Sequence, residues 1–326
     1  MQERELAANL VKITPLSSHD GPGLRTTVFF KGCPLHCRWC HNPETIHPFP
    51  ELKWTKRDCI GCRQCEKACK NGAIDFSLKR EYVIDTDKCI RCFSCVEHCP
   101  SKALSIIGHK YSPQTLSACI LKDEALLKSM DGGVTFSGGE PALYPDFITV
   151  LARKLKERDL HLALDTCGQV SSSAYERMLP FLDLLLFDIK EINPERHIAF
   201  TGKDNRRVID NLHIIAGLIR KSRLHTRIWV RTPLIPGMTA SVENIAGIGK
   251  LLNDSFSDLI DKWELCAFNN MCADKYTELG LNRSLATVPL LTNEEMAALL
   301  DTAKKSAGEI KQITASGLIK QNSYDD

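Results

Sequence analysis

The cysteines are the feature of this sequence that most restricts what it can fold into. The chain has 15 cysteines among 326 residues, and 11 of them lie between Cys33 and Cys99 in short, regular spacings. Disulfide scaffolds with this many cysteines are typical of small secreted domains that lack a core. A chain of this length can bury a full core in about two domains. The pattern therefore indicates a reduced, cytoplasmic metalloprotein.

Eight of these cysteines form an internal repeat. The spacing C-x2-C-x2-C-x3-C occurs at residues 59–69 and again at 89–99. It resembles the repeat of the bacterial two-cluster ferredoxins, in which the fourth cysteine of each run binds the other cluster. That resemblance implies two [4Fe–4S] clusters, one held by Cys59, Cys62, Cys65 and Cys99 and the other by Cys89, Cys92, Cys95 and Cys69. A pair of zinc knuckles is the alternative, but zinc sites rarely use two adjacent runs of this kind.

A third motif precedes the repeat and stops at three cysteines, Cys33, Cys37 and Cys40. Tetrahedral zinc sites and iron–sulfur clusters normally take four protein ligands. Either His36 or His41 closes a zinc site, or a [4Fe–4S] cluster keeps one iron open to a substrate or cofactor. The four remaining cysteines are scattered beyond residue 110: Cys119, Cys167, Cys266 and Cys272.

Outside the repeat, strand-like and helix-like segments alternate. Strands are expected at 24–31, 133–138, 160–166, 183–190, 225–235 and 263–269. Helices are expected at 112–130, 144–159, 171–182, 205–222, 241–254 and 293–307. Such βα units produce a parallel sheet that is buried on both faces. About six units are too few for an eight-fold barrel, so the pattern favours an α/β fold with a partial open (β/α)6-type barrel over a doubly wound open sheet.

Residues 51–110 break this alternation and are predicted to form an α+β ferredoxin-like insert. The barrel is then discontinuous, built from residues 1–50 and 111–326. Within the insert, the two cysteine motifs fall in about residues 51–79 and 80–110. In either kind of α/β fold, functional groups are expected where the strands end and the loops begin.

Composition excludes several classes of partner. A formal net charge of +2 provides no basic surface of the kind that duplex nucleic acids require. No apolar run approaches the roughly 20 residues that span a bilayer, so we expect no membrane association. The first residues, MQERELAANLVKI, include early acids and no apolar stretch, so we expect no secretory signal.

The three-cysteine loop resembles that of the radical S-adenosylmethionine (SAM) superfamily. The resemblance rests on the Cys-x3-Cys-x2-Cys spacing directly after a strand, with Trp39 before the last cysteine. The flanking sequences HDGPGLRTTVFFKGCP and HNPE are similar to those of the glycyl-radical-enzyme activating enzymes. The ferredoxin-type insert is similar to that of the larger members of this family. The resemblance covers most of the chain and implies a radical SAM partial barrel.

The resemblance also implies which residues bind SAM. The methionyl amine and carboxylate would chelate the open iron, beside Trp39, Cys40 and His41. The SGGEP stretch at 137–141 would bind the methionine part through Gly138, Gly139 and Glu140, although GGEP alone is a turn motif. Further contacts would come from strand ends: Asp165, Thr166, Asp188, Ile189, Lys190, Arg231 and Asn269. The alternatives are a helix cap or an Asp188–Lys190 ion pair for the aspartates, and a surface salt bridge for Arg231.

Asn269 stands where some relatives have a histidine. An asparagine can still contact the cofactor through hydrogen bonds, but it does not titrate near neutrality and cannot transfer a proton. The resemblance in any case requires no side chain as general acid or base. The resemblance also allows for a monovalent cation that Asp165 helps to hold.

The implied reaction is radical chemistry in an anaerobic cytoplasm. A flavodoxin or ferredoxin would deliver an electron, by way of the insert, to the cluster at Cys33, Cys37 and Cys40. Reductive cleavage of SAM would then give a 5′-deoxyadenosyl radical, which removes hydrogen from a backbone glycine of a glycyl radical enzyme. We expect a monomer with three [4Fe–4S] clusters, and we expect the partner's glycine loop to enter extended across the strand-end face.

Two other functions remain open at this point. A radical SAM enzyme with auxiliary clusters could modify another peptide or a small molecule. A plain electron-transfer protein would explain the eight-cysteine insert, but it would leave GGEP and the three-cysteine loop without a role.

Overall fold

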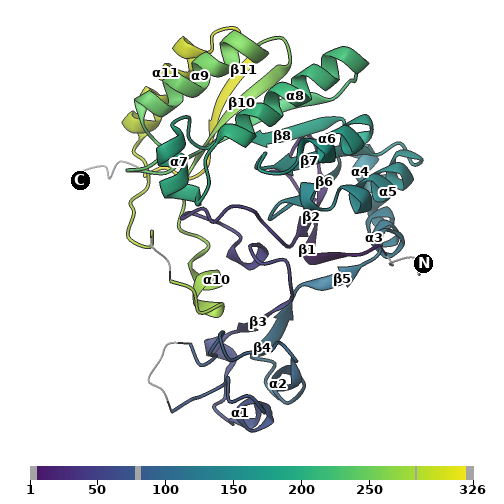
Figure 1. Ribbon diagram of the computed structural model, residues 1–326, viewed down its shortest axis with the longest axis vertical. Coiled ribbons are helices and arrows are strands. Elements are labelled where there is room, and N and C mark those ends of the chain that lie inside the picture. Colours follow the sequence, from purple (N-terminus) through teal and green to yellow (C-terminus); the bar gives the residue numbers. More distant parts are fainter. Residues whose placement is uncertain (1–5, 78–81, 283–284, 321–326) are drawn as a thin grey trace.

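The computed structural model describes residues 6–77, 82–282 and 285–320. Nine strands form its main sheet, in the order β11-β10-β9-β8-β7-β6-β2-β1-β5. They are β1 (Ala8–Ser17), β2 (Arg25–Phe30), β5 (His109–Tyr111), β6 (Gly133–Gly138), β7 (His161–Thr166), β8 (Leu184–Asp188), β9 (Arg227–Leu234), β10 (Ile260–Ala267) and β11 (Gln312–Ser316). The sheet ends in β5 on one side and β11 on the other (Figure 1), so it is open.

Seven neighbouring strands of this sheet, β2 and β6 to β11, are parallel. Their central strands are almost entirely buried, as in RTTVFF of β2 and LLLFD of β8. Each predicted strand is present, and the open parallel α/β sheet is confirmed. The sequence reasoning did not foresee β1, β5 and β11. Strand β1 pairs antiparallel with β2 and with β5, so the sheet continues beyond β2 by two antiparallel strands.

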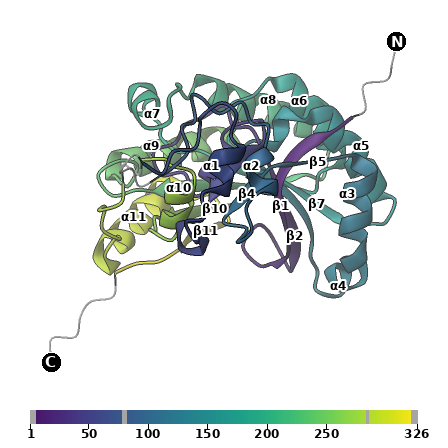
Figure 2. The ribbon, with the colours of Figure 1, turned by 90° about the horizontal axis from the view of Figure 1, so that it is seen from below.

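Helices form an arc around the strands, as Figure 2 shows from below. They are α3 (Pro113–Ile120), α4 (Glu124–Ser129), α5 (Pro145–Lys156), α6 (Ser172–Met178), α7 (Pro194–Thr201), α8 (Arg206–Ser222), α9 (Val242–Phe256) and α11 (Asn293–Ser306). A further helix, α10 (Ala273–Glu278), lies outside this arc. Ser112 caps α3 by accepting a hydrogen bond from the Thr115 N–H, and Pro113 occupies the first helical position, as expected.

The single helix predicted over 112–130 is wrong in one respect. A 3-10 turn at Leu121–Asp123 separates α3 from α4, so the segment consists of two short helices. Helices α7 and α10 were not predicted, since both are short and follow loops. No helix in the described part of the chain is long and apolar enough to cross a membrane.

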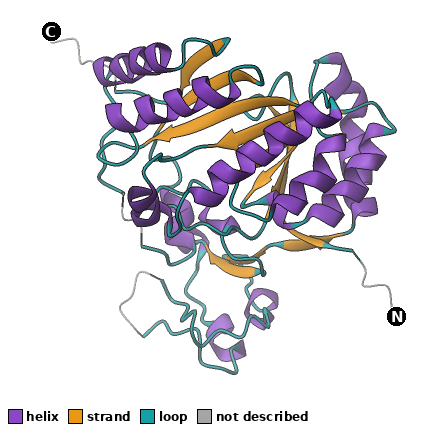
Figure 3. Cartoon of the chain, turned by 45° about the horizontal axis from the view of Figure 1, so that its top comes forward, coloured by secondary structure: helices purple, strands orange, loops and turns teal. Residues whose placement is uncertain are grey.

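Residues 51–77 and 82–107 fold below the main sheet (Figures 1 and 3). Strands β3 (Glu51–Trp54) and β4 (Leu104–Ile107) pair antiparallel, and α1 (Gln64–Ala68) and α2 (Ser94–Glu97) occupy equivalent places in the two cysteine runs. These elements pack on a hydrophobic cluster of their own, separate from the one beneath the main sheet. Its buried members include Leu52, Trp54, Ile74, Ile84 and Leu104.

Candidate active site

A cavity of about 670 Å³ lies at the carboxyl ends of the parallel strands, where the fold predicts a site. Its wall includes all three cysteines of the three-cysteine loop. Of the other residues predicted to bind the cofactor, these line it: Trp39, His41, Gly138, Gly139, Asp165, Thr166, Asp188, Lys190, Arg231 and Asn269. Elements far apart in the sequence therefore converge on one space.

The three-cysteine loop is held by backbone hydrogen bonds on both sides. The N–H groups of Gly32 and Cys33 donate to the carbonyls of Thr45 (2.7 Å) and Ile46 (2.9 Å). The His36 N–H donates to the Thr201 carbonyl at the end of α7, at 2.8 Å. The His36 residue is exposed. This placement favours His41 over His36 as the histidine that faces the cavity.

The two glycines of SGGEP are required by close approach to strand β2 and to the start of the cysteine loop. Gly138 has φ of +112°, and a Cβ there would lie 2.4 Å from the Phe30 nitrogen. A Cβ on Gly139 would lie 2.3 Å from the Gly32 carbonyl oxygen. Any larger residue would push β2 or the loop away from β6, because these contacts are with backbone atoms.

The loop thiols are partly buried and influence one another's pKa. Burial raises the pKa of Cys37 to about 12, and burial together with the neighbouring Cys37 raises the pKa of Cys40. A hydrogen bond from Cys167 is the main reason that the pKa of Cys33 is lowered. Iron binds thiolates, so a bound cluster must supply the positive charge that stabilises three deprotonated cysteines here. The donor set fits a [4Fe–4S] cluster held by three thiolates.

The charged wall of the cavity consists of Asp165, Asp188, Lys190 and Arg231, with Asp20 in contact behind it. Arg231 pairs with Asp165, and its guanidinium lies 3.7 Å from both Asp20 and Asp188. Lys190 pairs with Asp188 at 2.6 Å. Burial alone would lower the pKa of Arg231, but Asp165 and Asp188 hold it well above its usual value. Arg231 thus belongs to a largely buried ion-pair network, with 17% of its side chain exposed, and the surface salt bridge considered as an alternative is wrong.

Glu140 forms hydrogen bonds within the protein at the edge of this site. Its side chain is fully buried, and its carboxylate accepts hydrogen bonds from the Ala142 N–H (2.9 Å), the Cys167 N–H (2.7 Å) and the Thr166 hydroxyl (2.9 and 3.0 Å). It therefore ties the SGGEP turn to the end of β7. A direct contact from Glu140 to a SAM ammonium group stays a prediction. Ile189 is likewise buried, and its N–H donates to the Arg231 carbonyl at 3.0 Å.

Several cavity residues were missed by the sequence reasoning. Asp20, Cys167, Trp229, Lys262, Glu264 and Cys266 either line the cavity or contact its charged wall. Trp229, Arg231 and Pro233 alternate along β9, as do Lys262, Glu264 and Cys266 along β10. This period of two was a usable signal, since alternate residues of a strand face one side of a sheet.

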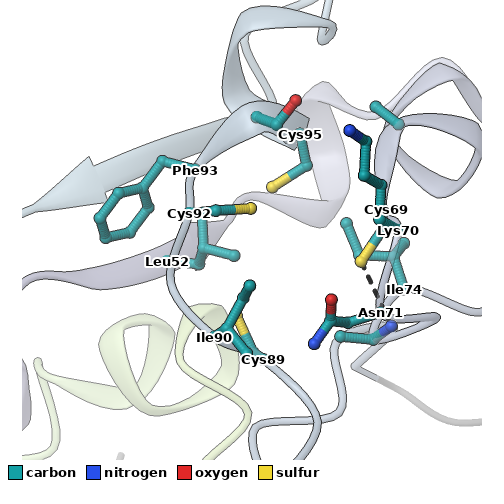
Figure 4. Close-up of a pocket in the computed structure, with 13 residues that line it drawn as sticks. Leu52, Cys69, Lys70, Asn71, Ile74, Cys89, Ile90, Cys92, Phe93 and Cys95 are labelled. Carbon is teal, nitrogen blue, oxygen red and sulfur yellow. Dashed lines mark hydrogen bonds between the residues drawn. The ribbon is translucent and has the colours of Figure 1, made fainter.

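The insert brings together the crossed set of cysteines. Cys69 from the first run faces Cys89, Cys92 and Cys95 from the second around a smaller cavity of about 250 Å³. Figure 4 shows these cysteine side chains around one space, with Leu52, Ile74 and Ile90 beside them. The Cys69 sulfur accepts a hydrogen bond from the Ala73 N–H at 3.2 Å. Burial raises the pKa of Cys95 to about 12, with Cys89 and Cys69 adding to the shift.

The other insert set is also close enough to interact. Burial raises the pKa of Cys65 to about 11, and the neighbouring Cys99 and Cys59 add to that shift. Cys62, the second cysteine of this run, is exposed. Cys99 is therefore near the first run although it belongs to the second, as a shared cluster requires.

Comparison with known proteins identifies the family. A family model described as a 4Fe-4S single cluster domain matches residues 19–209. The indoleacetate decarboxylase activating enzyme of Tractidigestivibacter scatoligenes is 35% identical, over 92% of this chain and 95% of its own. The isethionate sulfite-lyase activating enzyme of Oleidesulfovibrio alaskensis is 34% identical, over 91% and 95% of the two chains. The chain belongs to the glycyl-radical-enzyme activating enzymes.

A third relative is equally similar. The 4-hydroxyphenylacetate decarboxylase activating enzyme of Clostridioides difficile is 33% identical, over 92% of this chain and 94% of its own. The three relatives carry names of activating enzymes for different reactions. Membership in the family therefore settles the class of this activating enzyme and leaves the identity of its partner to experiment.

Proposed function

We propose that this protein activates a glycyl radical enzyme of the decarboxylase or sulfite-lyase type. The observation that carries the proposal is the convergence of Cys33, Cys37 and Cys40 with the strand-end residues on one cavity. When bound there, the cluster and SAM supply reductive cleavage to a 5′-deoxyadenosyl radical, which removes a hydrogen atom from a glycine Cα. The chain's own residues bind, orient and exclude water.

SAM would be held by the charged wall and by the backbone of SGGEP. Arg231 and Lys190 are the cations available to a carboxylate, and Asp165 and Asp188 are the anions available to an ammonium group. The side chains of Asp165 and Asp188 are 16% and 22% exposed, so the wall stays accessible from the cavity. The excess of one carboxylate over the cations also supports the monovalent cation near Asp165.

The insert would hold two further clusters and relay electrons to the site. Its crossed cysteine sets and its separate hydrophobic cluster support both this assignment and a domain boundary near residues 50 and 110. We further propose that the donor is a flavodoxin or ferredoxin and that the enzyme acts as a monomer in the cytoplasm.

The deciding experiment is anaerobic reconstitution with iron and sulfide, followed by reaction with SAM, a reductant and purified candidate glycyl radical enzymes. We expect about twelve irons per chain, since three cubanes hold four each. We also expect 5′-deoxyadenosine and a glycyl radical signal in electron paramagnetic resonance. Formation of 5′-deoxyadenosine with no radical on any candidate would reject these partners, and absence of both products would reject the reaction itself.

A further inference from the structure

A short segment outside the motifs described above connects the site to the insert. Residues Cys272–Gly280 contain helix α10 and follow strand β10 of the main sheet. In Figure 1, α10 lies between the sheet and the insert. We call this segment the α10 clasp, because it makes polar contacts in both directions.

One side of the clasp holds the end of the three-cysteine loop. The Tyr276 hydroxyl donates to the Cys40 carbonyl at 2.8 Å. The Lys275 ammonium group donates to the His41 carbonyl at 2.9 Å and to the Asn42 side chain at 2.8 Å. It also pairs with Glu44 at 2.7 Å. The clasp thus contacts four consecutive or near-consecutive residues, beginning at the last predicted iron ligand.

The other side of the clasp holds the insert. The Glu278 carboxylate pairs with Lys53 of β3 at 2.7 Å and accepts a hydrogen bond from the Thr55 hydroxyl at 3.0 Å. Gly280 has φ of +67°, and a Cβ built on it would lie 2.2 Å from the ring of Tyr82. The glycine therefore allows the end of the clasp to press against the insert.

Together, these contacts fix the distance between the three-cysteine loop and the insert. Six helical residues span about 9 Å, so α10 is a short, stiff element that holds the Cys40 carbonyl and strand β3 at a fixed separation. Strand β3 supplies Leu52 to the wall of the Cys69, Cys89, Cys92 and Cys95 cavity. The partly buried Lys53–Glu278 pair contributes little by itself, but here it acts together with several contacts on one element.

We propose that the α10 clasp positions the insert relative to the three-cysteine loop, and that Tyr276, Lys275, Glu278 and Gly280 are positioning residues for electron delivery. The inference rests on the proposed relay function of the insert. In that step, one electron leaves a reduced low-potential donor protein and reaches the site cluster by way of the insert. The donor is oxidised by one electron, and no covalent bond or proton changes place.

The test uses the reconstituted holoenzyme with two reductants, a reduced flavodoxin or ferredoxin and dithionite, which is small enough to reach the cavity directly. Gly280→Ala wedges the clasp against Tyr82, and Glu278→Lys removes the pairing with Lys53. For both, we expect the donor-driven rate of 5′-deoxyadenosine formation to fall at least about fivefold. This is the change expected if the correctly positioned insert becomes less stable by about 1 kcal/mol. The dithionite-driven rate stays at the wild-type value.

Two controls separate positioning from general damage. Gly237 has φ of +72° and nothing within 4 Å of its would-be Cβ, so Gly237→Ala introduces the same backbone strain without a wedge, and both of its rates should match wild type. The double variant Lys53→Glu/Glu278→Lys restores the ion pair with reversed charges, and it should recover the donor-driven rate that Glu278→Lys loses.

Three outcomes would overturn the inference. Unchanged donor-driven rates in Gly280→Ala and Glu278→Lys would show that the clasp positions nothing. Equal losses with both reductants would show that it only supports the cysteine loop. An unchanged donor-driven rate in Cys92→Ser would show that the insert is no relay. The proposed reaction fails separately, if wild-type holoenzyme forms no 5′-deoxyadenosine with either reductant.

Discussion

The two cysteine-rich regions of this protein differ in the number of cysteines they bring together and in the side chains around them. The three-cysteine loop lies on the rim of a cavity of about 670 Å³ whose other walls carry charges and glycines. The insert surrounds a cavity of about 250 Å³ with four cysteines and apolar side chains. A set of four thiolates completes a cluster, whereas a set of three leaves an iron for chemistry. The region with four cysteines thus has a mostly apolar cavity wall, and the region with three has a charged one.

The largest expected effect tests this division directly. Cys37→Ser removes a ligand from the incomplete set, and 5′-deoxyadenosine should fall below detection with any reductant. Cys92→Ser removes a ligand from a complete set, and only the donor-driven reaction should fall. Each variant should lose about four irons per chain. Cleavage that persists in Cys37→Ser would contradict the assignment.

Cys119→Ser is the matched control for both variants. Cys119 lies in α3 and belongs to none of the three sets, so the substitution should preserve iron content and activity. Loss of iron in Cys119→Ser would show that cysteine substitutions disturb reconstitution in general, and the comparison between the two sets would then carry no weight.

The second prediction concerns removal of iron. The insert has a small hydrophobic cluster and one two-stranded sheet, and such a unit is marginal in water without its metal. The main sheet has an extensive core that needs no iron. After anaerobic chelation, amide hydrogen exchange should become rapid within residues 51–77 and 82–107 while strands β6 to β9 stay protected. If both regions lost protection together, the insert and the main sheet would not be independently stable, and the prediction would be wrong.

Much of this arrangement could be predicted from the sequence, because the strongest signals are periodic or covalently close. The parallel strands were found from runs such as LLLFD, and the cysteine sets from their spacing. The crossed partnership of Cys69 with the second run came from a resemblance and agrees with the shared cavity. Helix α10 escaped because six residues contain too few turns for a periodic signal.

Contacts between distant residues could not be predicted for a different reason. Asp20 reaches Arg231 only because the loop before β2 folds toward β9. No local pattern in a single sequence predicts that these two segments lie close together. Glu140 was assigned to the ligand from its motif, yet its hydrogen-bond partners Thr166 and Cys167 lie on the next strand end. Motif and residue type placed Arg231 and Glu140 at the site, but their actual contacts depend on tertiary packing.

The third prediction compares two arginines on strand β9. Arg231 faces the cavity among three carboxylates, whereas Arg227 pairs with Asp261 at the exposed beginning of the strand. Arg231→Gln leaves the largely buried Asp165 without its cation, whereas Asp188 keeps Lys190, and should lower the free energy of unfolding by about 3 kcal/mol. Arg227→Gln, the matched control, should lower it by about 1 kcal/mol or less. Urea titrations without SAM measure both, and equal losses would show that the cavity wall is no more sensitive than the surface.

The smallest predicted effect concerns Glu140, whose carboxylate accepts hydrogen bonds from Ala142, Thr166 and Cys167. Glu140→Gln places an amide NH2 opposite N–H or O–H donors, so one buried donor loses its acceptor, and the free energy of unfolding should fall by about 1–3 kcal/mol. Glu176→Gln, on the exposed side of α6 next to Tyr175, is the control and should change nothing measurable. Because the carboxylate holds the SGGEP turn against the end of β7, Glu140→Gln should also weaken SAM binding in equilibrium titrations. If SAM affinity falls while the stability is unchanged, Glu140 contacts the cofactor directly, and the supporting role derived from its hydrogen bonds is wrong.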